Sequence, residues 1–188
     1  MTTGAAAPTD GWLLVIDHQR IFADPASEWC APRFEQTAPV LARLASHFGD
    51  RVLLTRWLPG TNREGSWAAY FEKWRFADRS DDDELFQLVP TATDLTDRPT
   101  VDVSTFGKWG PELAAVTGEN AHLVLAGVAT DCCVISTALA AADAGCTVTV
   151  VSDACAGSSE ENHAAALQVM GLYAPQITVV SSDELLHR

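Results

Sequence analysis

Positive charge is scarce in this sequence. Lys and Arg together number 12 against 25 Asp and Glu, which gives a formal net charge of −13 at pH 7. A surface this acidic repels nucleic acid and anionic membranes, so we expect neither as a partner. The sequence also lacks a signal-peptide pattern and any apolar run of about 18 residues that would span a membrane, so we expect a cytoplasmic protein.

Organised cysteine spacing is absent as well. The five cysteines are an odd number, and they show neither a CxxC pair nor a Cys/His spacing. This argues against a disulfide framework and against a structural zinc site. The chain has no internal repeat and no second composition regime, and its 188 residues suit one domain. We place this domain at residues 11–188, after a disordered tail at residues 1–10.

What the sequence does contain is a regular alternation of short apolar runs and helical patterns. Apolar, β-branched runs predict strands, and apolar stripes at helical spacing predict helices. The expected strands are residues 12–16, 51–56, 100–103, 123–126, 147–151 and 176–180, and the expected helices are residues 34–48, 111–116, 136–144 and 163–173. The alternation predicts a three-layer α/β/α domain with a mainly parallel, Rossmann-like sheet. Residues 18–22 are expected to form a loop.

Cys132 and Cys133 follow the apolar strand at residues 123–126 and precede an Ala-rich helix. Ligands of open α/β sheets bind at the carboxyl ends of the strands, and a helix N-terminus favours a thiolate. This position therefore predicts a nucleophile, although a free cysteine is otherwise often a small core residue. The other cysteines, Cys30, Cys146 and Cys155, have no such context and are expected to pack in the core.

Two charged residues flank the same crevice in the predicted topology. Asp17 ends the strand at residues 12–16, so it is either a loop cap or a general base aimed at the cysteine. Lys108 lies between Phe106 and Trp109 in a glycine-flanked loop. It is either a solvated surface charge or a lysine partly desolvated by these aromatic neighbours, which would lower its pKa. His163, at a helix start, either reaches the site or is structural.

The segment from residue 57 to residue 83 is unusually aromatic and interrupted by Pro and Gly. Trp57, Trp67 and Trp74 either line a substrate pocket or pack beneath a long loop, and we expect them in the pocket. Phe22 and Thr130 are expected to line the same pocket. The partner we expect is therefore a small-molecule substrate.

The stretch Gly127–Val134, followed by Thr137-Ala138 and Asp143-Ala144-Gly145, resembles the nucleophile motif of the isochorismatase-like cysteine hydrolases. Ile16-Asp17-His18-Gln19 resembles the N-terminal aspartate motif of the same family. The resemblance covers residues 12–180.

This resemblance implies an Asp-Lys-Cys triad without a cofactor. Cys133 is then the nucleophile, Asp17 removes the thiol proton and later activates water, and Lys108 holds the two charges in register. The family pattern also implies a cis peptide at Val128-Ala129. That peptide would aim the backbone amides of Ala129 and Cys133 at the oxyanion. Relatives of this kind commonly form dimers or larger oligomers, so we expect a homo-oligomer.

The sequence departs from the family pattern in two places. Metal-dependent nicotinamidases of the family carry an Asp-x-His element where this chain reads Thr55-Arg56-Trp57-Leu58, so we expect no metal site and do not favour nicotinamide. Many relatives also place the lysine ahead of an aromatic-Ser-Ala-Phe segment, and this chain offers only Lys108.

The reading we favour is a metal-independent amidohydrolase that cleaves a small-molecule amide, or a related C–N bond, through a thioester. One alternative is a binding or regulatory protein that has lost the chemistry. The others are a Cys132-Cys133 redox pair and a hydrolase of the vinyl ether of isochorismate.

Overall fold

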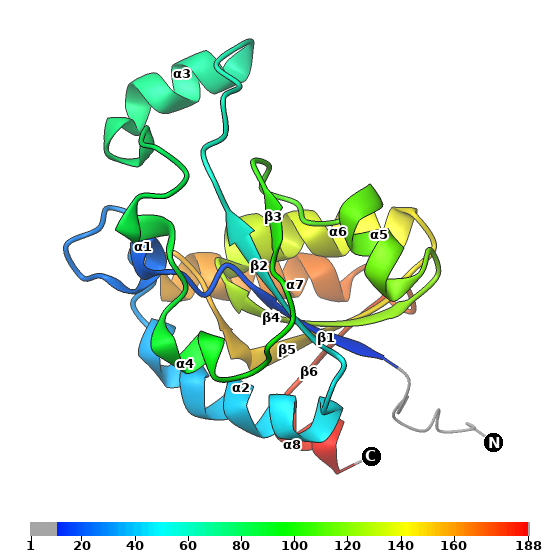
Figure 1. The fold of residues 1–188 in the computed structure, drawn as a ribbon. Helices are drawn as coiled ribbons and strands as arrows, with labels where there is room; N and C mark the ends of the chain where they lie inside the picture. The colour runs from blue at the N-terminus through cyan, green and yellow to red at the C-terminus, as the bar shows by residue number, and fades with distance from the viewer. Residues whose placement is uncertain (1–10, 188) are drawn as a thin grey trace.

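A single parallel sheet forms the centre of the molecule (Figure 1). The computed structural model describes residues 11–187; the tail expected at residues 1–10 lies outside the described residues. The six strands lie in the order β3-β2-β1-β4-β5-β6, and every paired neighbour is parallel. Their bounds are β1 (Trp12–Ile16), β2 (Val52–Trp57), β3 (Val101–Val103), β4 (His122–Val128), β5 (Thr147–Ala156) and β6 (Ile177–Val180).

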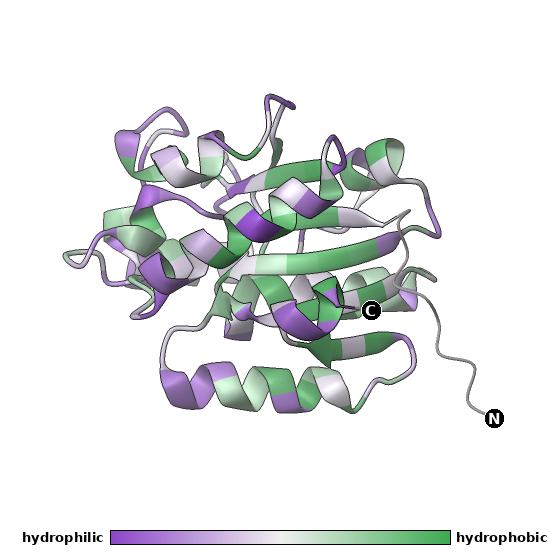
Figure 2. Cartoon of the chain, turned by 90° about the horizontal axis from the view of Figure 1, so that it is seen from below, coloured by the Kyte–Doolittle hydropathy of each residue, from purple (hydrophilic) through white to green (hydrophobic). Residues whose placement is uncertain are grey.

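Helices cover both faces of the sheet, which confirms the three-layer prediction. The helices α2 (Phe34–Phe48) and α8 (Ser182–Leu186) pack on one face, and α5 (Pro111–Thr117), α6 (Ile135–Asp143) and α7 (Glu160–Gly171) pack on the other. Apolar side chains fill both layers, and Figure 2 shows the strands largely hydrophobic while the outer helices mix both characters. Burial of this kind stabilises the sheet by roughly 25 cal/mol for each Å² of apolar surface removed from water.

The helix ends follow local sequence signals. Helix α2 ends at Gly49, whose φ of 60° suits a residue without a Cβ. Helix α7 begins where the Ser159 side chain accepts a hydrogen bond from the Asn162 amide, three residues earlier than expected. The short helix α8 was not expected; it starts in a capping box formed by Ser181 and Glu184.

Most of the other short helical segments lie beyond the carboxyl ends of the strands: α1 (Arg20–Ala23), α3 (Ser66–Lys73) and the 3-10 helices η1 (Arg75–Ala77) and η2 (Glu84–Phe86). Helix α4 (Pro90–Thr93) instead packs against α2. In Figure 1, α3 stands apart from the sheet. The predicted loop at residues 18–22 is wrong in part, because residues 20–23 form one helical turn whose Ile21 and Phe22 are buried. Among helices formed by residues 11–187, none has the length and apolar character needed to cross a membrane.

The strand order of the sheet changes direction between β1 and β4, the two central strands. The chain adds β2 and β3 on one side of β1, then returns to place β4 on the other side. Gly127 of β4 lies beside Ile16 of β1 with a φ of +109°, and a Cβ on Gly127 would collide with the Ile16 backbone. The two strands therefore approach closely at the switch point, where open α/β sheets bind ligands.

Candidate active site

Asp17 and Lys108 form a fully buried ion pair at the carboxyl end of the sheet. Asp17 directly follows β1, and Lys108 lies in the loop between β3 and α5. The Lys108 Nζ atom is 2.8 Å from Asp17 Oδ2, and both side chains are 0% exposed. Within residues 11–187 no hydrogen bond of good geometry reaches Oδ2. This oxygen therefore keeps a lone pair that can accept a proton.

The Asp17 carboxylate is held in place from β2. Thr55 Oγ1 donates a hydrogen bond of 2.7 Å to Asp17 Oδ1 and accepts one of 3.2 Å from the Asp17 amide. Asp17 adopts a φ of 50°, in the left-handed region that Asp tolerates better than most residues. The backbone turn and the threonine together orient Oδ2 toward Lys108.

The loop that carries Lys108 is tied to the helix that follows the cysteines. Lys108 Nζ donates to Thr105 O at 3.1 Å. The Lys108 amide donates to Thr137 Oγ1 at 2.9 Å, and the same hydroxyl donates to Cys133 O at 2.7 Å. Thr137 therefore joins the lysine loop directly to the cysteine turn.

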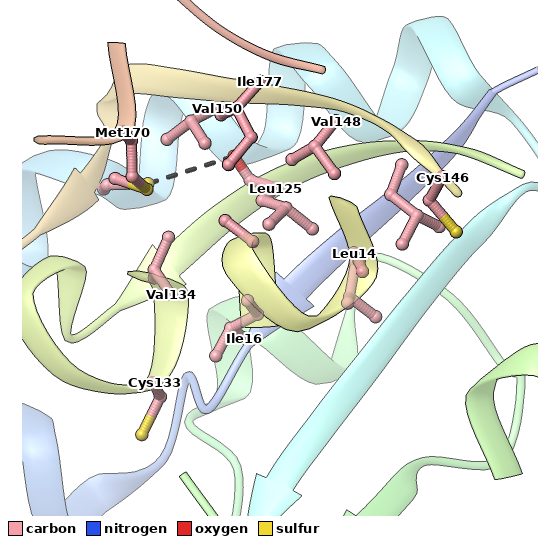
Figure 3. Packing of buried hydrophobic residues seen from close by; sticks show 14 of the residues in the cluster. Leu14, Ile16, Leu125, Cys133, Val134, Cys146, Val148, Val150, Met170 and Ile177 are labelled. Atoms are coloured by element: carbon pink, nitrogen blue, oxygen red, sulfur yellow. Dashed lines mark hydrogen bonds between the residues drawn. The ribbon is translucent and has the colours of Figure 1, made fainter. Parts of the chain in front are cut away.

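Cys133 lies in a π-helical turn, η3 (Thr130–Val134), between β4 and α6. Cys133 is only 3% exposed. In Figure 3 its sulfur lies at the edge of the apolar cluster and points away from Val134 and Leu125. The Asp17 carboxylate and the Lys108 ammonium are both close enough to shift the pKa of the Cys133 thiol. The structure thus brings Asp17, Lys108 and Cys133 into one region.

The electrostatics of Cys133 differ from the sequence-based expectation of a thiolate. The hydrogen bond with Cys132, burial and the Asp17 carboxylate raise the pKa of Cys133 well above its usual value, and only Lys108 opposes them. The turn η3 continues directly into α6, so Cys133 lies near the N-terminal end of a continuous helical segment that follows β4, as predicted, and burial and the neighbouring groups outweigh that position. Cys133 rests as a neutral thiol, which makes a nearby proton acceptor necessary for nucleophilic attack.

The Val128-Ala129 peptide is cis, at the position where the sequence predicted it. Ala129 and Cys133, whose backbone amides were expected to bind an oxyanion, both line the same cavity.

This cavity has a volume of about 380 Å³, within the range of small-molecule sites. Cys133 and Cys132 both line it. Six of its thirteen lining residues are aromatic: Phe22, Trp29, Trp57, Tyr70, Trp74 and Phe106. Gln19 fixes part of this wall, because its buried amide bonds the Trp57 backbone N–H and C=O.

Two residues predicted to line the pocket lie elsewhere. Thr130 is fully buried and bonds His163 Nδ1 at 2.8 Å, so its side chain faces α7. Trp67 packs against Phe106 and Tyr70 from behind, with ring centroids 5.2 Å from each. Neither side chain borders the cavity. His163 therefore has a structural role, which is one of the two alternatives that the sequence left open.

Three aromatic lining residues, Trp29, Tyr70 and Phe106, were not assigned to the pocket from sequence, and Cys30, expected in the core, also lines the cavity. The Trp29 ring contacts Trp57, Tyr70 and Trp74 across the cavity wall. The sequence feature that could have assigned Trp29 to the pocket is its position soon after β1, on the same edge of the sheet as Asp17.

The carboxyl end of β2 carries a charged side chain that pairs with the neighbouring strand. Arg56 makes a two-pronged contact with Asp102, at 3.0 and 2.6 Å, which links β2 to β3. Within the part of the chain that the structure describes, no group of three or more His, Cys, Asp or Glu side chains is placed to hold a metal ion.

The fold and this site define an α/β protein with a buried Asp-Lys pair beside a cysteine at the switch point of a parallel sheet. The family model described as "Isochorismatase domain" matches residues 11–184. The chain therefore belongs to the isochorismatase-like hydrolase family.

Solved structures share the fold at low sequence identity. A cysteine hydrolase from Pseudomonas syringae pv. phaseolicola superposes with a TM-score of 0.80 at 14% identity, covering 96% of this chain and 92% of that one. An isochorismatase family protein from Desulfovibrio vulgaris gives 0.77 at 22% identity, covering 95% and 99%. The nicotinamidase of Bacillus subtilis gives 0.73 at 19% identity, covering 92% and 99%. A search of curated proteins finds no match.

Proposed function

We propose that this protein is a cysteine hydrolase that cleaves a small-molecule amide, or a related C–N bond, through a thioester at Cys133. The observation that carries the proposal is the buried Asp17-Lys108 pair next to a cysteine that lines a cavity with six aromatic residues in its wall. A buried ion pair without a functional role is costly to keep, since apolar replacements are often at least as stable.

The first half of the reaction forms the thioester. Asp17 Oδ2 accepts the Cys133 proton, and the thiolate attacks the amide carbonyl carbon. The backbone amides of Ala129 and Cys133 stabilise the oxyanion; loss of one such donor typically costs ~10²–10³ in rate. The C–N bond then breaks, and the proton held by Asp17 leaves with the amine.

The second half hydrolyses the thioester. Asp17, again ionised, accepts a proton from water, and the resulting hydroxide attacks the thioester carbonyl. The C–S bond breaks, the thiolate recovers its proton, and a carboxylic acid leaves. Amide and water become acid and amine, without net oxidation. Lys108 stabilises the ionised carboxylate at each stage, because the two charges face one another in a site that excludes water.

Two named neighbours support parts of this proposal without identifying the substrate: a cysteine hydrolase supports the use of a cysteine, and a nicotinamidase supports cleavage of an amide. We do not favour nicotinamide itself, because the Asp-x-His element expected of metal-dependent nicotinamidases is replaced at the end of β2, where Arg56 instead pairs with Asp102.

The test is turnover of an amide panel by Cys133→Ala, with Cys146→Ala as the matched control. Cys146 is also buried but lies at the opposite end of the sheet, before β5. The Cys133→Ala protein should fold and lose turnover by at least about 10³-fold, and mass spectrometry of the wild type should detect an acyl adduct on Cys133. Equal turnover by the two variants would overturn the proposal. A folded wild type that turns over no amide would favour a binding role.

A further inference from the structure

The charges around the cavity have one sign. Of the described residues that line it, none is Lys, Arg or His, while Glu28 and Asp131 both contribute carboxylates. Asp131 is already engaged, since its two oxygens accept hydrogen bonds from the Ser158 amide and hydroxyl at 2.8 and 2.6 Å. Glu28 forms no ion pair within residues 11–187 and is exposed to the cavity entrance.

Trp29 is the centre of the aromatic wall. Its ring centroid lies 5.2 Å from that of Trp57 and 5.9 Å from those of Tyr70 and Trp74. These three contacts are tilted or edge-on, with interplanar angles of 75°, 42° and 70°. The π face of an aromatic ring attracts a cation within about 6 Å of its centroid, and this wall places several such rings beside the cavity.

Cations near the cavity do not offset the negative charge of its lining residues. Lys108 is neutralised by Asp17 at 2.8 Å, and Arg33 pairs with Glu160 at 3.3 Å. Lys73 stacks its ammonium 4.8 Å from the ring of Trp74 but does not line the cavity. The formal charge of the whole chain, −13, adds to the negative potential.

We propose that the substrate carries a positively charged group, such as a substituted ammonium, in addition to the scissile amide. The rings of Trp29, Tyr70 and Trp74 receive this group, and Glu28 balances its charge. A substrate with a carboxylate at this position would meet the carboxylates of Glu28 and Asp131 and no Lys, Arg or His among the residues that line the cavity. This inference rests on the proposed function only in calling the ligand a substrate.

Binding of probes that cannot be hydrolysed tests the charge preference directly. Wild-type protein is titrated with benzyltrimethylammonium, with its uncharged isostere neopentylbenzene, and with phenylacetate. Trp29, Trp57 and Trp74 line the cavity, so tryptophan fluorescence reports occupancy. The cation should bind about 10-fold more tightly than the isostere, as expected for a desolvated cation–π site, and phenylacetate more weakly than either.

Charge-neutral variants assign the effect to Glu28. Glu28→Gln should weaken binding of the cation by about 3-fold or more and leave the isostere unchanged. Glu72→Gln is the matched control, because Glu72 is exposed on α3 and does not line the cavity. Equal affinities for cation and isostere, tighter binding of phenylacetate, or identical effects of the two substitutions would each overturn the inference.

Turnover separates this inference from the proposed function. The substrates are 4-(trimethylammonio)butyramide and its uncharged isostere 5,5-dimethylhexanamide, and the expected kcat/KM ratio is about 10 in favour of the cation. Selective binding of benzyltrimethylammonium with no hydrolysis of any amide would refute the hydrolase and keep the cation site. Hydrolysis of both amides with similar kcat/KM values would keep the hydrolase and refute the cation site.

Discussion

The ammonium of Lys108 lies 2.8 Å from the carboxylate of Asp17, and neither side chain is exposed to solvent. The two charges offset each other's cost of burial, because an isolated charge at this depth would be far too costly to bury. Loss of either partner therefore affects both stability and chemistry.

Replacement of one partner should be more harmful to stability than replacement of both. Asp17→Asn and Lys108→Met each leave an unpaired buried charge, so each should lower the free energy of unfolding by about 3–5 kcal/mol, and the double variant by less. Each single variant should also lose about 10²–10⁴ in kcat/KM. Urea unfolding measures the first effect and steady-state kinetics the second.

The control for this experiment is the exposed Arg43-Asp183 pair, whose atoms are 2.6 Å apart. Arg43→Gln should change stability by no more than about 1 kcal/mol. Additive losses in the Asp17-Lys108 double variant would contradict the coupling that the structure implies.

Cys132 should modulate the nucleophile without being one. Its hydrogen bond contributes most to the raised pKa of Cys133, so Cys132→Ala should lower that pKa. We expect faster alkylation of Cys133 by iodoacetamide at pH 7 while amide turnover is retained, with labelling located by peptide mass spectrometry. Loss of all turnover in Cys132→Ala would instead revive the redox-pair hypothesis.

Gly127→Ala should disrupt the junction of β1 and β4. A Cβ at this position meets the Ile16 backbone, and the φ of +109° is strained for Ala. We expect a loss of more than about 3 kcal/mol, or failure to fold. Gly49→Ala is the control: its φ of +60° is also positive, but no atom lies within 4 Å of the added Cβ, so it should cost only about 1 kcal/mol. Similar thermal unfolding of the two variants would disprove the close-approach argument.

His18 should make the protein less stable in mild acid. Thr37 Oγ1 donates its hydrogen to Phe34 O at 2.6 Å, so His18 Nε2 donates to Thr37 Oγ1 at 3.0 Å and Nδ1 carries no proton. Nδ1 has no partner within residues 11–187, and burial lowers the pKa of His18 from 6.5 to about 4.

The sign of this effect follows from proton binding. Between pH 6.5 and about 4 the unfolded chain binds the His18 proton and the folded chain does not, so stability falls as the pH falls through this window. The loss from His18 should be about 2 kcal/mol between pH 7.5 and 5. His18→Gln should reduce the pH dependence of urea unfolding by this amount; an unchanged slope would show that His18 does not contribute.

The central layers were predictable because their signals are local. Runs such as Leu123–Ala126 are too apolar for any position except a buried strand, and the stripe on Phe34–Phe48 fits only a covered helix face. Asp17 and Cys133 could be chosen because both follow such strands. Helices α1 and α8 were missed because they have four and five residues, too few for a periodic pattern.

The pocket lining was less predictable, because the direction of a loop side chain depends on partners far away in sequence. Thr130 turned toward His163 rather than the cavity, and Trp29 entered the cavity wall by meeting Trp57 and Trp74. No spacing encodes these contacts. The predictions of a homo-oligomer and of a cytoplasmic location stay predictions.

The placement of β4 beside β1 has a consequence for synthesis of the protein. Asp17 and Cys133 are neighbours in space but are separated by more than half of the chain. A growing polypeptide carries its carboxylate through most of translation before the sulfur leaves the ribosome. A chain that ends before β4 therefore lacks Cys133 and cannot assemble the proposed Asp17-Lys108-Cys133 site.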